Sequence, residues 1–458
     1  MNRLRTFPDG FTWGVATAAY QIEGAVAEDG RSPSIWDTFA HTPGRVASGD
    51  TGDVACDHYH RWRDDLDMVA SLGIPAYRFS ASWSRVLPDG HTVNQAGVDY
   101  YKRLVDGCLE RGIRPVLTLY HWDLPQALDE GPEGGWLDRS VADRFVDYAV
   151  LLGKELGDRI PVVTTLNEPW CSAYLGYASG EHAPGRTSNP LAFRAAHHLN
   201  LAHGRAVAAL RSTLPVTAEV SVTLNLHQVV PAGRTDADLA AARHVDLVAN
   251  RIFLDPMLRG GYPEELVETT RHLTDWSFVR PGDETDIHQP LDFLGVNYYN
   301  PAAVAASGQH APFPGTPFPG TDRAVRSDLP APHTIMGWPI VPSGLTALLV
   351  RIHREYGVPL VVTENGMAAP DPVGADGHVH DRDRIGYVHD HLDALLDAVD
   401  EGVDVRGYFV WSLLDNFEWA WGYAKRFGIV HVDFETQQRT PKDSARWYAG
   451  VVARNALT

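Results

Sequence analysis

Eight short runs of apolar, β-prone residues are spread along the chain, and longer segments of helical period separate them. Bounded runs of this length, rich in β-branched and aromatic residues, predict strands. The predicted strands are Trp13–Tyr20, Ala76–Ser80, Arg114–Tyr120, Val162–Asn167, Glu219–Leu224, Phe293–Tyr298, Leu360–Glu364 and Gly407–Ser412.

Two of the intervening segments show the helical period clearly. Asp57–Leu72 places apolar side chains three and four residues apart and is followed by Gly73, which predicts an amphipathic helix that ends at the glycine. Ser140–Leu156 carries a similar apolar face, and its first residue, Ser140, forms a predicted capping pair with Asp143. Strands that alternate with helices favour a parallel (β/α)8 barrel over an open doubly wound sheet.

One stretch interrupts the alternation. Residues 301–342 hold 9 of the 31 prolines, too many for a central strand or a helix interior. A linker between two domains is one interpretation. We prefer a long loop after the sixth strand, because the pattern resumes with a helix from Ser343 and two more strands. Residues 1–458 are therefore predicted to form a single (β/α)8 barrel domain with long active-site loops.

Composition narrows the function classes. The formal net charge of −19 argues against nucleic acid or an anionic membrane as the main partner. The chain has three cysteines and no C-x-x-C pair, which makes a disulfide framework or a Cys-based zinc site improbable. No nucleotide-binding glycine motif occurs, so nothing in the sequence indicates nucleotide chemistry. No apolar leader or membrane-length apolar run is found, which suggests a cytoplasmic protein. The 13 tryptophans are more than a core needs, and aromatic planes bind the apolar faces of sugars.

Polar side chains follow the predicted strands at their carboxyl ends, which in a barrel surround one cleft. Two carboxylates stand out because each directly ends an apolar strand: Glu168 after Val162–Asn167, and Glu364 after Leu360–Thr363. A rim salt bridge to arginine would be the plain structural explanation for either one. Two such carboxylates, surrounded by Gln, Asn, His and Trp at the other strand ends, instead indicate cleavage of a glycosidic bond.

The residues at these strand ends carry a family resemblance. Thr165-Leu166-Asn167-Glu168-Pro169 and Val362-Thr363-Glu364-Asn365-Gly366 resemble the two catalytic signatures of glycoside hydrolase family 1, and Phe11–Gly24 resembles its N-terminal signature. The similarity covers essentially the whole chain in the family's order, through Tyr77-Arg78-Phe79-Ser80, His121-Trp122-Asp123, Gly295-Val296-Asn297-Tyr298-Tyr299, Trp411–Trp419 and Pro441-Lys442.

The resemblance implies a role for each matching residue. Glu168 would be the general acid/base and Glu364 the nucleophile, with Arg78 and Tyr299 keeping Glu364 ionised and aimed. Asn167 would bind the sugar 2-hydroxyl. The other expected sugar contacts are Gln21, His121, Asn297, Tyr299, Trp411, Glu418 and Trp419. The aglycone would lie against Trp338, Cys171, His182 and Asn225.

The two carboxyl groups need different protonation states. The acid must hold its proton near neutral pH, above the ordinary glutamic acid pKa of about 4.3, whereas the nucleophile must be charged. The resemblance further implies a carboxyl separation of ~5–5.5 Å, the spacing of retaining enzymes. We therefore expect a retaining β-glycosidase, most simply a β-glucosidase, that acts on small β-glycosides such as cellobiose and aryl glucosides. Such an enzyme would take part in cellulose and polysaccharide degradation. We expect that it needs no cofactor or metal.

Several alternatives stay open. A transglycosylating enzyme shares the covalent intermediate, and a β-galactosidase or β-fucosidase preference uses the same contacts from Gln21 and Glu418. A non-catalytic sugar-binding protein and a 6-phospho-β-glycosidase are disfavoured because Glu168, Glu364 and Glu418 are all present. A metal site is also disfavoured, because no second ligand cluster accompanies His197, His198 and His203, which are interpreted as packing or surface residues. A cysteine nucleophile is disfavoured because Cys171 has no histidine partner motif. Oligomeric state is not predicted.

Overall fold

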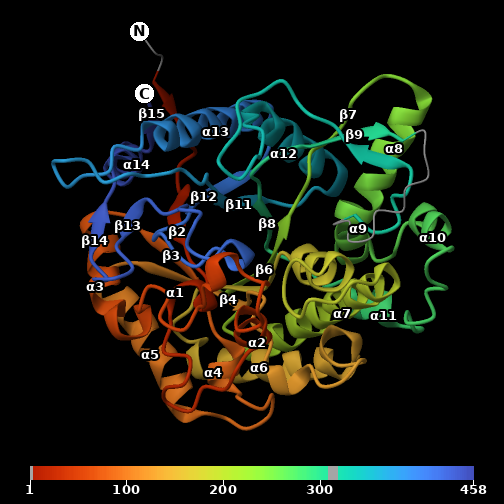
Figure 1. The fold of residues 1–458 in the computed structure, drawn as a ribbon, viewed down its shortest axis with the longest axis horizontal. Helices are drawn as coiled ribbons and strands as arrows, with labels where there is room; N and C mark the ends of the chain where they lie inside the picture. The colour runs from red at the N-terminus through yellow and green to blue at the C-terminus, as the bar shows by residue number, and fades with distance from the viewer. Residues whose placement is uncertain (1–3, 308–317) are drawn as a thin grey trace.

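Eight parallel strands close into a barrel in the computed structural model, which describes residues 4–307 and 318–458 (Figure 1). The order around the barrel is β11-β12-β2-β3-β4-β5-β6-β8, and every neighbouring pair is parallel. The barrel strands are β2 (Thr12–Ala16), β3 (Ala76–Ser80), β4 (Arg114–Tyr120), β5 (Val162–Asn167), β6 (Glu219–Asn225), β8 (Phe293–Asn297), β11 (Leu360–Asn365) and β12 (Val405–Trp411). The predicted (β/α)8 barrel is confirmed.

Helices on the outside of the barrel connect successive strands (Figure 1). The longer ones are α3 (His58–Ser71), α5 (Gln95–Glu110), α6 (Ser140–Leu156), α7 (Asn189–Thr213), α8 (Asp236–Asp246), α12 (Pro342–Tyr356), α13 (Arg382–Asp400) and α14 (Asp443–Arg454). Shorter ones are α1 (Ala19–Ile22), α2 (Ile35–Ala40), α4 (Trp83–Val86), α9 (Ile252–Arg259), α10 (Glu264–Thr270) and α11 (Asp283–Ile287). Among the helices in the described ranges, none has both the length and the apolar composition that crossing a membrane requires.

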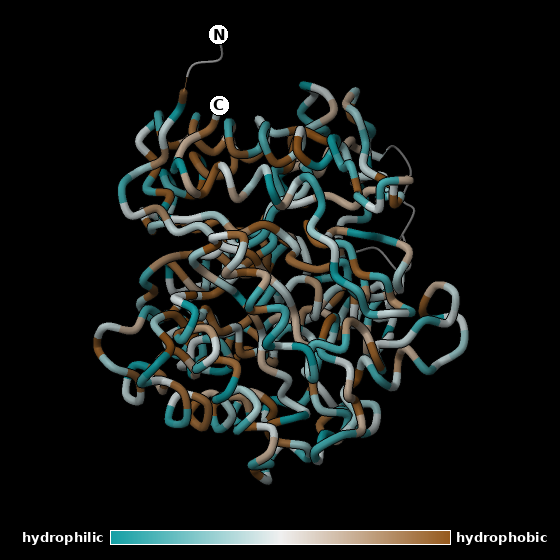
Figure 2. The backbone as a smooth tube through the Cα atoms, turned by 90° about the vertical axis from the view of Figure 1, so that its left-hand side faces the viewer, coloured by the Kyte–Doolittle hydropathy of each residue, from teal (hydrophilic) through white to brown (hydrophobic). Residues whose placement is uncertain are grey.

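The core lies inside the barrel and between the barrel and its helices. Four of the eight barrel strands, β3, β5, β8 and β11, are buried along their whole length, as expected for parallel strands covered on both faces. In Figure 2 the hydrophobic segments accordingly gather in the interior, while hydrophobic and hydrophilic segments alternate along the outer helices. Outside the barrel, β1 (Arg5–Thr6) pairs with β15 (Ala456–Leu457), so the two ends of the described chain lie side by side.

Two details of the local predictions are wrong. The first strand ends at Ala16 instead of Tyr20, because Ala19–Ile22 turns into a short helix whose first amide binds Ser80 Oγ at 2.7 Å. Helix α6 begins at Ser140 as predicted, but Arg139 occupies the N-cap position and no side chain caps the helix. Asp138 accepts the Ser140 amide at 2.8 Å, so Ser140 and Asp143 do not form a capping pair. The predicted helix end at Gly73, which has a φ of +66°, is confirmed.

The proline-rich stretch joins two strands of one barrel. Residues after it form β11 and β12, which complete the same barrel as β2 to β8, so the stretch is a long loop after the sixth barrel strand and does not link two separate barrels. Its described part contains two short strands, β9 (Ala302–Ala306) and β10 (Ala324–Arg326). β9 is the central strand of a small sheet and pairs with β10 on one side and with β7 (Val229–Pro231) on the other. The central prolines, at 312, 314 and 317, lie outside the described residues.

A buried ion network fixes the chain that follows β12. Lys442 is fully buried, and its Nζ donates to Asp371 at 2.6 Å and to Asp415 at 2.7 Å. Arg384 forms ion pairs with Asp371 and Asp381, and Arg426 donates to Asp415 at 2.7 Å. Three carboxylates thus face three cations. Asp415 lies within the segment Trp411–Trp419. The network therefore anchors that segment to α13 and α14.

We predict that Lys442→Met lowers the free energy of unfolding by about 3–5 kcal/mol, because removing one partner leaves buried carboxylates incompletely paired. The shift of the chemical denaturation midpoint measures the effect. Lys102→Met is the matched control, since Lys102 pairs with Glu155 at the surface, where an ion pair is worth at most about 1 kcal/mol. Equal shifts for the two variants would show that the network does not stabilise the fold.

Candidate active site

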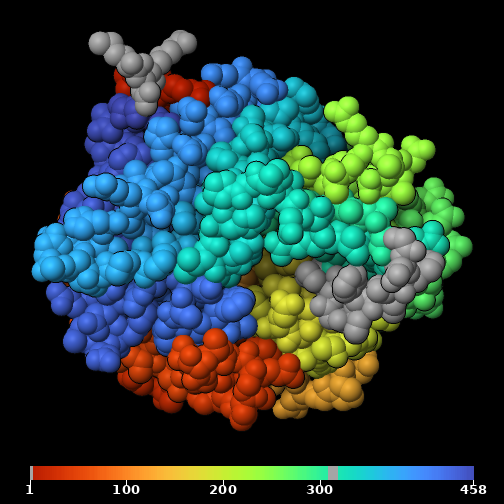
Figure 3. Space-filling model, turned by 45° about the horizontal axis from the view of Figure 1, so that its top comes forward, coloured from red at the N-terminus to blue at the C-terminus, as the bar shows by residue number. Residues whose placement is uncertain are grey.

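The carboxyl ends of the barrel strands carry the predicted site residues. Arg78 lies on β3, Asn167 and Asn297 are the last residues of β5 and β8, and Glu364 lies on β11. On the face shown in Figure 3 the surface is hollowed where the blue chain after β12, the teal proline-rich stretch and the yellow chain after β5 meet. Strands remote in sequence thus deliver polar side chains to one place.

Glu364 is held by two donors. Arg78 Nη1 donates to its Oε1 at 2.5 Å, and the Tyr299 hydroxyl donates to its Oε2 at 2.7 Å. The Arg78 side chain is buried, so its charge acts in a medium that screens it little. Burial and the charge of Glu364 raise the pKa of Tyr299 well above its ordinary value, so the phenol remains a donor. Glu364 therefore has both oxygens fixed and its negative charge paired.

Glu168 sits in a different environment. Asn297 Nδ2 donates to its Oε1 at 2.6 Å, and Cys171 Sγ lies 3.2 Å from its Oε2. No cation within residues 4–307 and 318–458 forms an ion pair with it. Burial and the negative charge of Glu364 raise the pKa of Glu168 to about 8. Its φ of +47° turns the chain directly after β5 and is a strained backbone for glutamate. Burial and the neighbouring carboxylate thus favour the protonated form of Glu168, whereas Glu364 is paired with Arg78.

The proton of Glu168 belongs on Oε2. Thr363 Oγ1 donates to Asn297 Oδ1 at 2.8 Å, which turns the Asn297 amide nitrogen toward Glu168. An amide nitrogen can only donate, so Oε1 accepts, whereas the sulfur of Cys171 beside Oε2 can also accept. The acid hydrogen therefore lies on Oε2 in the protonated carboxyl, and the thiol donates to Oε2 once the carboxyl is ionised. The oxygen that can deliver a proton is therefore the one beside Cys171.

A second chain of hydrogen bonds orients Asn167 and His121. Arg78 Nη2 and Asn297 Nδ2 both donate to Asn167 Oδ1, at 2.6 and 3.1 Å, so the Asn167 nitrogen faces His121 Nε2 at 3.0 Å. Burial lowers the pKa of His121 well below its ordinary value, so the ring is neutral and its Nε2 accepts. The hydrogen then lies on Nδ1, a buried atom without a protein partner. One Asn167 N–H and the His121 Nδ1–H are thus free to donate to a ligand.

The segment after β12 brings the remaining sugar-contact candidates together. Gln21 Nε2 donates to Asn416 Oδ1 and to the Phe417 carbonyl, each at 2.9 Å, and lies 3.4 Å from Glu418 Oε2. Gln21 Oε1 is buried without a partner. The rings of Trp411 and Trp419 stack beside His121, with centroids 5.8 and 6.0 Å from its ring.

Burial and the charges of Glu364 and Glu168 raise the pKa of Glu418 to about 8. A carboxyl that is neutral below that pH donates one hydrogen bond and accepts others, which suits sugar hydroxyls. A charged Glu418 would repel the phosphate of a 6-phospho-β-glycoside, and this argument against a 6-phospho-β-glycosidase is strongest above that pKa.

The predicted aglycone residues fall into two groups. Asn225 Nδ2 contacts Cys171 Sγ at 3.8 Å, next to Glu168, and the Trp338 ring packs on Tyr299 with centroids 5.4 Å apart. His182 instead packs against Trp36 and Trp122, with centroids 5.1 and 5.2 Å away. Cys171 and Trp338 therefore flank the two carboxyl groups, whereas His182 lies behind the ring of Trp419.

Sequence reasoning missed several supporting residues. Trp122 donates its Nε1–H to the Asn167 carbonyl at 2.9 Å, Thr363 orients Asn297, and Asn416 accepts from Gln21. All three lie inside the motifs already noted: Trp122 and Thr363 directly follow or precede a predicted site residue, and Asn416 lies two residues before Glu418. The motifs signal their positions, but nothing local identifies their partners on other strands.

The other histidine and cysteine candidates are structural. His197, His198 and His203 are buried and bind Asp283, the Trp136 carbonyl and Thr165. Burial raises the pKa of the Cys171 thiol, which disfavours a thiolate nucleophile. Across residues 4–307 and 318–458, no three His, Cys, Asp or Glu side chains are grouped so that they could hold a metal ion.

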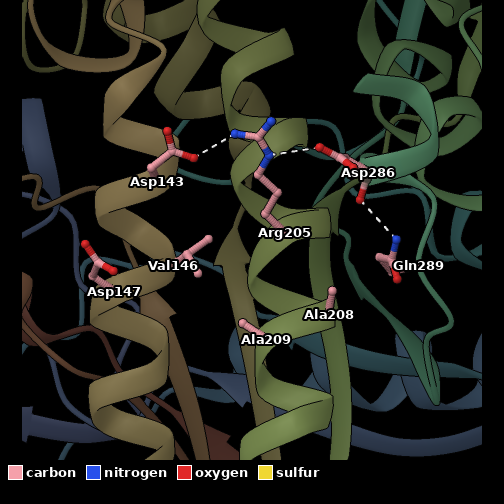
Figure 4. A pocket seen from close by; sticks show the side chains of 8 residues that line it. All are labelled: Asp143, Val146, Asp147, Arg205, Ala208, Ala209, Asp286 and Gln289. Atoms are coloured by element: carbon pink, nitrogen blue, oxygen red, sulfur yellow. Dashed lines mark hydrogen bonds and ion pairs between the residues drawn. The ribbon is translucent and has the colours of Figure 1, made fainter. Parts of the chain in front are cut away.

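A separate surface hollow of about 460 Å³ lies between α6, α7 and α11 (Figure 4). Arg205 extends across it and pairs with Asp143 at 2.7 Å and with Asp286 at 3.0 Å. None of the predicted site residues lines it, and its polar groups are already paired.

Comparison with known proteins places this geometry in a family. The model of glycosyl hydrolase family 1 matches residues 3–457. A bifunctional β-D-glucosidase/β-D-fucosidase of Bifidobacterium breve is 56% identical over 98% of each chain, and β-glucosidase A of Thermotoga maritima is 47% identical over 99% of each. The crystal structure of a psychrophilic β-glucosidase from Micrococcus antarcticus superimposes with a TM-score of 0.94 at 49% identity, covering 98% of each chain.

We predict that Cys171 adjusts the pKa of Glu168. Cys171→Ala removes a donor to the carboxylate and should raise that pKa, whereas Cys171→Ser supplies a stronger donor and should lower it. The basic limb of the pH profile of kcat/KM for an aryl β-glucoside should therefore lie highest in the Ala variant and lowest in the Ser variant. The reverse order, or identical profiles, would remove Cys171 from this role.

Proposed function

The chain belongs to glycosyl hydrolase family 1, and we propose that it is a retaining β-glucosidase in which Glu168 is the general acid/base and Glu364 the nucleophile. One observation carries the assignment: Glu364 is paired with Arg78, whereas Glu168 has no cation and its pKa is raised to about 8. Two buried carboxyl groups in such different environments take the roles of charged nucleophile and protonated acid.

In the first step, Glu364 attacks the anomeric carbon while the bond to the aglycone oxygen breaks. Glu168 transfers its proton from Oε2 to that oxygen, so the aglycone leaves as a neutral alcohol and the sugar remains as an α-linked ester of Glu364. Arg78 and Tyr299, which bind the two carboxylate oxygens before attack, keep the nucleophile aimed.

In the second step, water attacks the same carbon from the face that the aglycone left. Esterification removes the negative charge of Glu364, so the pKa of Glu168 falls and its carboxylate can take a proton from that water. The ester bond breaks, Glu364 regains its charge, and the product is the β-anomer. Net retention requires the short carboxyl separation stated above, ~5–5.5 Å.

The glycone contacts follow from the free donors and acceptors of the site. The unused Asn167 N–H would bind the 2-hydroxyl, and His121 Nδ1–H and Gln21 Oε1 would bind further hydroxyls, since both atoms are buried without protein partners. Glu418 would bind the outer hydroxyl groups of the ring. The remaining proposed contacts to the glycone are from Asn297, Tyr299, Trp411 and Trp419.

The aglycone would lie between Trp338 and the pair formed by Cys171 and Asn225, because these groups flank Glu168 and Tyr299. Cellobiose and aryl glucosides fit a site with an aromatic wall on that side. His182, which packs behind Trp419, would support the glycone end instead.

A β-fucosidase activity is a second candidate, favoured by the dual activity named for the Bifidobacterium breve relative. Hydrolysis is proposed to outweigh transglycosylation, with cellulose-derived oligosaccharides as one source of substrate. We further propose that residues 1–458 act as one domain in the cytoplasm. The net charge of −19 supports the proposal that the protein has no nucleic acid or membrane partner.

Replacing Glu168 with Ala separates its role from that of Glu364. A dinitrophenyl glucoside needs no proton on its leaving group, so the variant should still form the glycosyl ester at nearly the normal rate. Turnover of cellobiose should fall by about 10²–10⁴-fold, the usual contribution of general acid catalysis. Stopped-flow release of dinitrophenol measures the rate of ester formation, and glucose release measures the turnover of cellobiose. Equal losses on the two substrates would contradict the assignment of Glu168 as the general acid.

A further inference from the structure

Trp421 is the one exposed tryptophan of the chain. All 13 tryptophans lie within the described residues; Trp421 is 49% exposed, whereas each of the other twelve is buried or only partly exposed. Single exposed apolar side chains are common on protein surfaces, so the position of Trp421 beside the glycone contacts, more than its exposure, makes it a candidate for ligand binding.

Trp421 lies at the end of the segment that carries the glycone contacts. It belongs to the same helical turn as Trp419, and its amide donates to the Glu418 carbonyl at 2.9 Å. The turn is fixed from outside: the Tyr423 amide donates to Asp50 at 2.9 Å and the Tyr423 hydroxyl to the Thr51 carbonyl at 2.8 Å. The indole is therefore attached to a well-held turn at the edge of the site.

Lys425 connects Trp421 to the opposite side of the hollow. Its Nζ lies 5.0 Å from the centre of the Trp421 ring and donates to the Ile335 carbonyl at 2.6 Å. Ile335 is itself 36% exposed and precedes Trp338 by three residues. The chain after β12 and the proline-rich stretch, which border the hollow in Figure 3, are thus joined by this lysine beside an exposed aromatic ring.

We propose that Trp421, with Lys425, is an outer binding position for the sugar residues of a β-linked glucose oligosaccharide that extend beyond the aglycone site; this rests on the proposed β-glucosidase function. A pyranose ring presents an apolar face that stacks on an indole, and its hydroxyls need donors at the edge. Lys425 still has two N–H groups after it binds Ile335. A sugar therefore finds both an apolar plane and polar partners here.

The charge of the protein favours this ligand over a membrane. A chain with a net charge of −19 is repelled by anionic lipids, whereas a neutral oligosaccharide is unaffected.

The test compares substrates of increasing length. For Trp421→Ala, the ratio of kcat/KM for cellotetraose to kcat/KM for p-nitrophenyl β-glucoside should fall on the order of 3- to 10-fold, the size of one aromatic stacking contact. The fall should arise in KM and be smaller for cellotriose, and Trp421→Phe should restore most of it because a ring remains. Val373→Ala, which truncates another exposed apolar side chain, is the matched control and should leave the ratio unchanged.

Two results would overturn the inference while leaving the proposed function intact: an unchanged ratio in Trp421→Ala, or an equal loss on every substrate, which would mean that the turn only supports Trp419. Absence of cleavage of p-nitrophenyl β-glucoside by the unaltered protein would instead contradict the proposed function itself.

Discussion

The catalytic end of the barrel is organised around one buried cation, Arg78. Its guanidinium donates to Glu364 and to Asn167, and because arginine can only donate, both acceptors are fixed by it. The Asn167 amide then has a single orientation, which sets the tautomer of His121. A lysine could not bridge the two partners in the same plane. The arrangement of side chains at the ends of β3, β5 and β11 thus depends on one charged group that is buried away from water.

This arrangement separates two chemically identical side chains. Glu364 lies against the cation, whereas Glu168 receives hydrogen bonds only from an amide and a thiol and lies near the charge of Glu364. Burial and the charge of Glu364 together raise the pKa of Glu168, so the part that Glu364 contributes is lost when Glu364 is esterified. The same coupling lets one residue act first as an acid and later as a base. The buried network of Lys442 and Asp415 anchors the segment that carries Glu418 and Trp419.

Much of this could be predicted from the sequence, for a physical reason. Parallel barrel strands are buried on both faces, so they stand out as apolar runs, and whatever polar residue ends them points into the cleft. This reasoning predicts Glu168 and Glu364 as the catalytic pair. The sequence could not predict features set by distant partners: the turn at Ala19 depends on Ser80, and the start of α6 depends on Asp138. The ring contacts of His182 with Trp36 and Trp122 are of the same kind. Local patterns do not contain those contacts.

The central claim is that Glu364 becomes covalently attached to the sugar. A 2-deoxy-2-fluoro-β-glucoside with a dinitrophenyl leaving group tests it most directly, because the fluorine slows both steps and the activated leaving group restores only the first. We expect inactivation with one fluoroglucosyl group per chain, located on Glu364 by peptide mapping. Proton NMR of an ordinary β-glucoside should show β-glucose first. A label on any other residue, or initial α-glucose, would contradict the account.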